Sequence, residues 1–137
     1  MKEITVDATV DNLDTVHDFV DEELKKYGCS TDVRLKIDLS IEELFVNIAS
    51  YAYQDKIGKA TIKIDISDGD LTAKIIFIDS GVPYDPLKKE DPDVTLSAEE
   101  RSIGGLGIYL VKKNMDDIEY KYEDGKNILS IKKKIKG

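Results

Sequence analysis

The segment KATIKIDISDGDLTAKIIFIDSG, residues 59–81, constrains the fold more than any other part of the sequence. Apolar and polar residues alternate through its first half, as they do in a β-strand with one buried face. Asp68 and Gly69 interrupt the pattern, and an Asp-Gly pair between two such runs is a strong signal of a β-hairpin. The second half ends in an apolar run at residues 75–78, which predicts a central strand covered on both faces. The chain is therefore expected to contain an antiparallel sheet.

Helix and strand patterns follow one another along the rest of the chain. Apolar residues at helical spacing predict helices over 11–28, from 30–32 to about 54, and over 105–114. Alternation predicts a strand over 3–10 and a second hairpin over 118–135, which turns at Asp124-Gly125. Hairpins combined with three helices predict an α+β fold, in which the helices pack on one face of a mostly antiparallel sheet. Because 137 residues contain no repeat or linker, we expect a single domain over 1–137.

The charge and composition argue against several classes of protein. A net charge of −8 and a pI near 4.7 argue against binding to the phosphate backbone of nucleic acids. The lysine-rich end KKKIKG, residues 132–137, contains no aromatic residue and fits a solvated strand end. No apolar run is long enough to span a membrane, and no signal-peptide pattern opens the chain, so secretion is not expected. The single cysteine, Cys29, excludes an internal disulfide and favours a cytoplasmic location.

The helix predicted over residues 30–54 carries polar side chains on a mostly apolar surface. A narrow stripe between two apolar arcs holds Glu43 and Asn47, which lie one turn apart. An unpaired buried carboxylate is costly, so this stripe must meet water, a partner or a ligand. A solvated helix edge explains such a pair equally well when the pair stands alone.

Two later segments contain further candidate residues. FIDSGVPYDP, residues 77–86, places Asp79 at the end of an apolar strand and Gly81 just after it. The carboxylate can accept a hydrogen bond from the exocyclic amine of a base, and the glycine lets a flat ring approach the backbone. A plain Asp-Ser-Gly turn is the alternative. RSIGGLGIYLVKKNMD, residues 101–116, places glycines before a helix, where exposed N–H groups bind phosphate oxygens; a flexible hinge is the alternative there.

Taken together in one small α+β domain, these segments resemble the GHKL ATPase superfamily, which shares the Bergerat fold. EELFVNIASYAY resembles its N box, DSGVPYDP its first glycine box, and ERSIGGLGIYLVKKNMD its lid end and second glycine box. The resemblance covers nearly the whole chain and is closest to the bacterial anti-sigma factors that are serine/threonine kinases. It implies a two-layer sandwich of three helices on a mostly antiparallel mixed sheet.

The resemblance also implies a role for each candidate residue. Glu43 matches the general base of phosphoryl transfer, and Asn47 matches a ligand of the Mg²⁺ that binds with ATP. Asp79 matches the carboxylate that binds adenine, with Gly81 beside the ring. Gly105 and Gly107 match glycines whose N–H groups contact the phosphates, and Gly104 supports the bend at this glycine-rich segment. Arg101 resembles a lid arginine that neutralises the charge of the terminal phosphate.

Three positions bear on the choice of subfamily. Tyr51 stands where many relatives have histidine, so we assign it no catalytic role. Pro83 stands where histidine kinases have a second glycine, which favours the anti-sigma branch. The lack of a phospho-acceptor helix pattern around His17 argues against a self-contained histidine kinase.

The resemblance thus implies an ATP- and Mg²⁺-dependent serine/threonine protein kinase that acts as an anti-sigma factor. The expected partners are a sigma factor and a small antagonist protein that it phosphorylates. A homodimer is expected, and direct binding to nucleic acid or a membrane is not. Two alternatives stay open: a nucleotide-dependent regulatory module without kinase activity, and a detached histidine-kinase-like ATPase domain.

Overall fold

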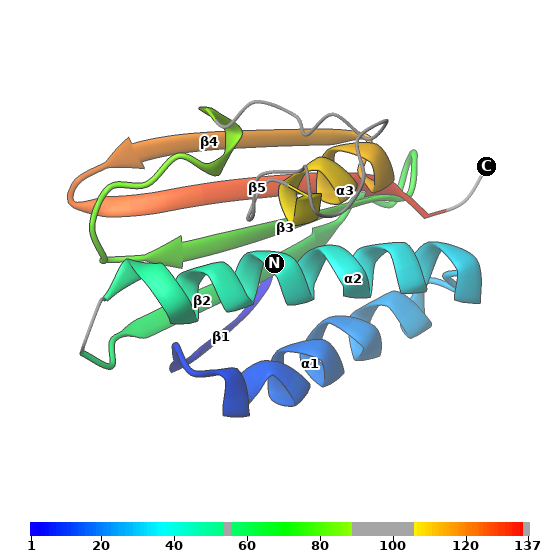
Figure 1. Ribbon diagram of the computed structural model, residues 1–137. Coiled ribbons are helices and arrows are strands. Elements are labelled where there is room, and N and C mark those ends of the chain that lie inside the picture. The colour runs from blue at the N-terminus through cyan, green and yellow to red at the C-terminus, as the bar shows by residue number, and fades with distance from the viewer. Residues whose placement is uncertain (54–55, 89–105, 136–137) are drawn as a thin grey trace.

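The computed structural model describes residues 1–53, 56–88 and 106–135, which form a layer of helices against one face of a β-sheet (Figure 1). Within these residues the strands are β1 (Lys2–Asp7), β2 (Lys59–Ile66), β3 (Thr72–Asp79), β4 (Asp117–Glu123) and β5 (Lys126–Lys134). The α-helices are α1 (Leu13–Lys26), α2 (Thr31–Asn47) and α3 (Leu106–Asn114). Short 3₁₀ turns cover Val10–Asn12 and Pro86–Lys88, and a π-helical turn, Ile48–Ala52, continues α2. The two-layer α+β architecture is therefore confirmed.

The sheet has the strand order β1-β2-β3-β5-β4, and every neighbouring pair is antiparallel. Both predicted hairpins are present. In the β4–β5 hairpin, Asp124 and Gly125 have φ angles of 54° and 76°, as the tightest hairpin turns require. The register of β3 with β5 places Asp79 directly opposite Asn127. Two polar side chains from distant parts of the sequence thus meet at one end of the central strands.

One apolar core lies between the sheet and the helices. On α1, the predicted apolar positions Val16, Val20 and Leu24 are fully buried. Phe45 of α2 and Phe77 of β3 are the largest fully enclosed side chains. The hydroxyl of Ser30 accepts a hydrogen bond from the N–H of Val33 at 3.3 Å and so caps α2, as the sequence indicated. None of the helices in the described ranges is long and apolar enough to cross a membrane.

The structure corrects three expectations about individual elements. The apolar run at the end of β3 is covered on one face, and Ile76 and Ile78 are half-buried on the other, because all described helices pack on the same side of the sheet (Figure 1). The first strand ends at Asp7 rather than at residue 10. A helix with two apolar arcs is expected to be buried on most sides, but Leu35 and Leu39 on one arc of α2 are 54% and 59% exposed.

Candidate functional site

Glu43 and Gly107 lie against each other where α2 packs on α3. A methyl group added at Gly107 would come within 2.0 Å of the carboxyl carbon of Glu43. Glycine at this position therefore makes room for the acid at the first turn of α3. Within the described residues, nothing hydrogen-bonds to or pairs with the Glu43 carboxylate. One turn before it, Ser40 is buried and donates a hydrogen bond to the carbonyl of Lys36 at 3.0 Å.

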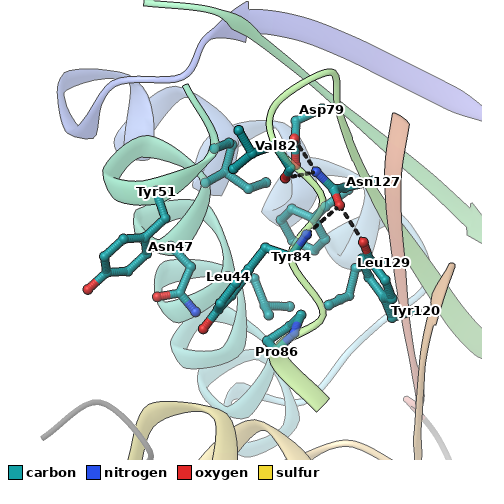
Figure 2. Close-up of a pocket in the computed structure, with 13 residues that line it drawn as sticks. Leu44, Asn47, Tyr51, Asp79, Val82, Tyr84, Pro86, Tyr120, Asn127 and Leu129 are labelled. Atoms are coloured by element: carbon teal, nitrogen blue, oxygen red, sulfur yellow. Dashed lines mark hydrogen bonds between the residues drawn. The ribbon is translucent and has the colours of Figure 1, made fainter. Parts of the chain in front are cut away.

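Asn47 and Asp79 line one cavity between the end of α2 and the end of β3 (Figure 2). Its enclosed volume is about 40 Å³. Asp79 is only 6% exposed, although it is a carboxylate. The walls are otherwise mostly apolar or aromatic: Leu44, Ile48, Tyr51, Ala52, Phe77, Val82, Tyr84, Pro86, Tyr120, Asn127 and Leu129. Two residues predicted from separate motifs therefore share a single site.

The Asp79 carboxylate is held by one oxygen and leaves the other available. Oδ1 accepts hydrogen bonds from the N–H of Gly81 and from Nδ2 of Asn127, both at 2.9 Å. No residue in the described parts of the chain donates a hydrogen bond to Oδ2. Because the side chain lines the cavity, this second oxygen is a hydrogen-bond acceptor for a ligand there.

Gly81 lies beside the backbone of the π-helical turn. The N–H of Val82 donates to the carbonyl of Ala52 at 2.8 Å, which draws the loop after β3 onto this turn. A side chain at Gly81 would bring its Cβ within 2.2 Å of the same carbonyl oxygen. The glycine therefore has a packing reason of its own, and its suggested contact with a flat ring stays a prediction.

Asn127 belongs to the site although it was not among the residues selected from sequence. Its side chain hydrogen-bonds Asp79, the carbonyl of Val82, the N–H of Tyr84 and the hydroxyl of Tyr120 (Figure 2). Burial raises the pKa of Tyr120, which favours the protonated hydroxyl that donates here. One signal was present in the sequence: Asn127 occupies an inward position of β5, in phase with the buried Leu129 and Ile131.

Tyr51 also lines the cavity, beside Tyr84. The two ring centroids are 6.2 Å apart and the ring planes are inclined by 34°. The Tyr51 side chain is 57% exposed, so its ring lies at the mouth of the cavity rather than in the core. No catalytic role was assigned to Tyr51 from sequence, and this position suits contact with a ligand instead.

The predicted phosphate-binding residues are only partly covered by the structure. Gly107 is placed at the start of α3, next to Glu43. Arg101, Gly104 and Gly105 lie outside the described residues. Within the described ranges there is no group of three or more acidic, histidine or cysteine side chains that could hold a metal. A Mg²⁺ site here would thus depend on Asn47 together with oxygens of the ligand and water, which is a common arrangement for this ion.

Comparison with known proteins identifies the family. The family described as "Histidine kinase-like ATPase domain" matches residues 6–133. The chain belongs to this ATPase family. Among curated relatives of this chain, two proteins named serine-protein kinase RsbW, from Bacillus cereus strains ATCC 10987 and B4264, are 32% and 34% identical over 111 residues. Each alignment covers 78% of this chain and 68% of the relative.

Solved structures agree on the fold of this chain. The RsbU and RsbW domains of a Mycobacterium tuberculosis protein match with a TM-score of 0.68 and 15% identity, over 98% of this chain and 33% of that one. The catalytic domain of the histidine kinase ThkA matches with a TM-score of 0.52 and 15% identity, over 98% of both chains. The family match and the curated relatives therefore confirm the resemblance to GHKL ATPases that the three motifs indicated.

Proposed function

We propose that this ATPase-family protein binds Mg-ATP and is a serine/threonine protein kinase that acts as an anti-sigma factor. The observation that carries the proposal is the convergence of separate motifs: Asn47 and Asp79 line one cavity, and Glu43 lies one turn before Asn47 on α2. The relatives named serine-protein kinase support the type of reaction.

The cavity has the chemistry needed to bind an adenine base. Its apolar walls suit the faces of a flat ring, and the unpaired Oδ2 of Asp79 suits the exocyclic amine. An enclosed volume of about 40 Å³ is well below the ~300–1,000 Å³ of ordinary ligand pockets. Binding would therefore require the mouth to widen, and the exposed ring of Tyr51 can move into solvent to allow this and then cover the base.

The other residues have complementary roles toward the phosphates and the protein substrate. The amide oxygen of Asn47 would hold Mg²⁺, which with ATP supplies the phosphoryl group and neutralises its charge. Gly107 lies where the first N–H groups of α3 are free of intrahelical partners and can meet phosphate oxygens. The Glu43 carboxylate, without a partner in the described structure, would take the proton from the attacking serine hydroxyl.

The proposed partners are a sigma factor and a small antagonist protein whose serine is phosphorylated. Phosphorylation adds up to about two negative charges to the antagonist. This chain has a net charge of −8, so phosphorylation would weaken the complex by repulsion. A homodimer is part of the proposal by analogy with the resembling anti-sigma factors.

Transfer of labelled γ-phosphate to a candidate antagonist tests the kinase activity. We expect Glu43→Gln to lower the rate by about 100-fold or more, because general-base catalysis contributes about 10²–10⁴. Its affinity for Mg-ATP should change by less than about threefold. Glu42→Gln is the matched control, since Glu42 is the neighbouring acid on α2 and is exposed. Normal transfer by Glu43→Gln would show that Glu43 is not the base.

The two alternative functions give different results in the same assay. ATP binding without transfer to any protein would indicate a regulatory module, and acid-labile phosphate on a partner would indicate a histidine-kinase-like activity. Thermal unfolding tests binding itself: a ligand at 100 times its dissociation constant stabilises a fold by ~2.7 kcal/mol. Absence of any shift with saturating Mg-ATP would contradict nucleotide binding altogether.

A further inference from the structure

All four hydrogen-bonding positions of the Asn127 side chain are occupied within the protein. Nδ2 donates to Oδ1 of Asp79 and to the carbonyl of Val82, both at 2.9 Å. Oδ1 accepts from the N–H of Tyr84 at 3.1 Å and from the hydroxyl of Tyr120. An amide has two donor and two acceptor positions, so none is left for a ligand. Asn127 can act on a bound nucleotide only through the residues it holds.

The orientation of this amide is determined by its neighbours. A carbonyl and a carboxylate oxygen surround one end, and an N–H and a phenol surround the other. Rotating the amide by half a turn would oppose acceptor to acceptor and donor to donor. Because Asn127 is only 6% exposed, such unpaired groups would be costly. Asn127 therefore has one favourable arrangement.

This arrangement fixes two features of the cavity at once. It holds Oδ1 of Asp79 away from the ligand, so that Oδ2 is the oxygen left for binding. It also fastens the loop after β3 at Val82 and Tyr84, which both line the cavity. The β3–β5 register provides the geometry, since Asp79 and Asn127 are directly opposite.

We propose that Asn127 is a positioning residue that makes the site select adenine over guanine; this inference rests on the proposed nucleotide-binding function. A fixed carboxylate oxygen accepts a hydrogen bond from the exocyclic amine of adenine. Guanine presents a carbonyl oxygen at the same place, which an oxygen of Asp79 repels. Without Asn127 only the N–H of Gly81 still holds Oδ1, so the carboxylate can turn more readily toward the N–H groups of guanine, and the discrimination falls.

The test compares binding of Mg-ATP and Mg-GTP to the full chain by calorimetry. Asn127→Leu keeps the branched shape of the side chain and makes no side-chain hydrogen bonds. We expect it to lower the affinity for ATP by about tenfold or more, because the Asp79 carboxylate loses one of its two charge-assisted hydrogen bonds. Affinity for GTP should stay the same or rise, so the ATP/GTP ratio falls.

A control variant separates selectivity from stability. Asn12 also hydrogen-bonds through its side chain, to the carbonyl of Asp7 at 2.9 Å, but not in the cavity. Asn12→Leu should lower the melting temperature without altering the ATP/GTP ratio. If Asn127→Leu does not fold, Asn127→Asp decides, since it keeps the shape and the acceptor oxygen while removing the donors to Asp79 and Val82.

The outcomes distinguish the inference from the function on which it rests. Wild type that prefers ATP, with Asn127 variants that keep this preference within about threefold, would overturn the positioning role and leave ATP binding intact. Wild type that binds neither nucleotide would overturn the proposed function and this inference with it. Selectivity lost in the Asn127 variants alone is the result we expect.

Discussion

Asp21 of α1 and Asp38 of α2 form a pair of neighbouring carboxyl groups between these helices. The Oδ1 atoms of both are buried and have no hydrogen-bond partner in the part of the chain that the structure describes. Burial, followed by the Asp21 carboxyl, raises the pKa of Asp38 from 3.8 to about 7, and the nearby His17 and Arg34 offset only part of this. Above neutral pH the fold therefore brings together charges that the unfolded chain keeps apart in water.

Asp38→Asn should remove this destabilisation. Because the pKa of Asp38 is higher in the folded state, its favourable contribution is present below about pH 4 and is lost as the pH rises through about 7. The difference between the two pKa values of Asp38 would correspond to about 4 kcal/mol of unfolding free energy if the group were fully buried. The side chain is partly exposed, and solvent screening reduces the expected effect to about 1–2 kcal/mol. Asparagine keeps the shape, carries no charge and can donate to Asp21.

Urea unfolding of wild type and variant across the pH range measures this effect. At about pH 8.5, Asp38→Asn should be more stable than wild type by about 1–2 kcal/mol, and the difference should shrink toward zero near about pH 5. Asp18→Asn is the matched control, because it makes the same substitution at an exposed position of α1. Repeating the pair in a His17→Gln background removes the imidazole contribution. A stability difference that is constant over this range would refute the reasoning.

Three further substitutions test close contacts around the site. Gly107→Ala should displace the Glu43 carboxylate and lower the rate of phosphoryl transfer by about tenfold or more, while the stability of α3 rises or stays the same. An unaltered rate of transfer would contradict the importance of this contact. Gly81→Ala forces a methyl group onto the Ala52 carbonyl and should cost about 1–3 kcal/mol in urea unfolding, so wild-type stability is the contrary result. Tyr53→Phe removes the hydroxyl that accepts a hydrogen bond from the N–H of Ser80 at 2.8 Å, and should lower the unfolding free energy by about 1–2 kcal/mol. A loss below about 0.5 kcal/mol would count against a structural role for this bond.

The architecture and the candidate residues Glu43 and Asn47 could be predicted from the sequence because both depend on local patterns. Turn chemistry at Asp124-Gly125 and apolar periodicity in α1 determine element types without reference to the rest of the chain. Glu43 and Asn47 stood out because they lie one turn apart in a narrow polar stripe between two apolar arcs of the helix. Their meeting with Gly107 and Asp79 could only be inferred from the resemblance, since it depends on how the helices pack.

The hydrogen-bonding partners of Asp79 were beyond sequence patterns. Asn127 is 48 residues away in the chain, and only the strand order and register bring it opposite. The packing reason for Gly81 was missed for the same cause, because Ala52 approaches it from another element. The prediction that β3 is covered on both faces was wrong, as the half-buried Ile76 shows. An apolar run alone does not distinguish a two-layer from a three-layer arrangement.

The π-helical turn Ile48–Ala52 makes the geometry of the site depend on the number of residues in this turn. A π turn contains about one residue more than an α turn, and successive α-helical residues rotate by about 100°. Removing a single residue here would swing the Ala52 carbonyl away from the N–H of Val82 and carry Tyr51 away from the cavity. Natural variants of this protein should therefore tolerate insertions and deletions in the β2–β3 hairpin loop, but keep the spacing between Asn47 and Ala52 unchanged.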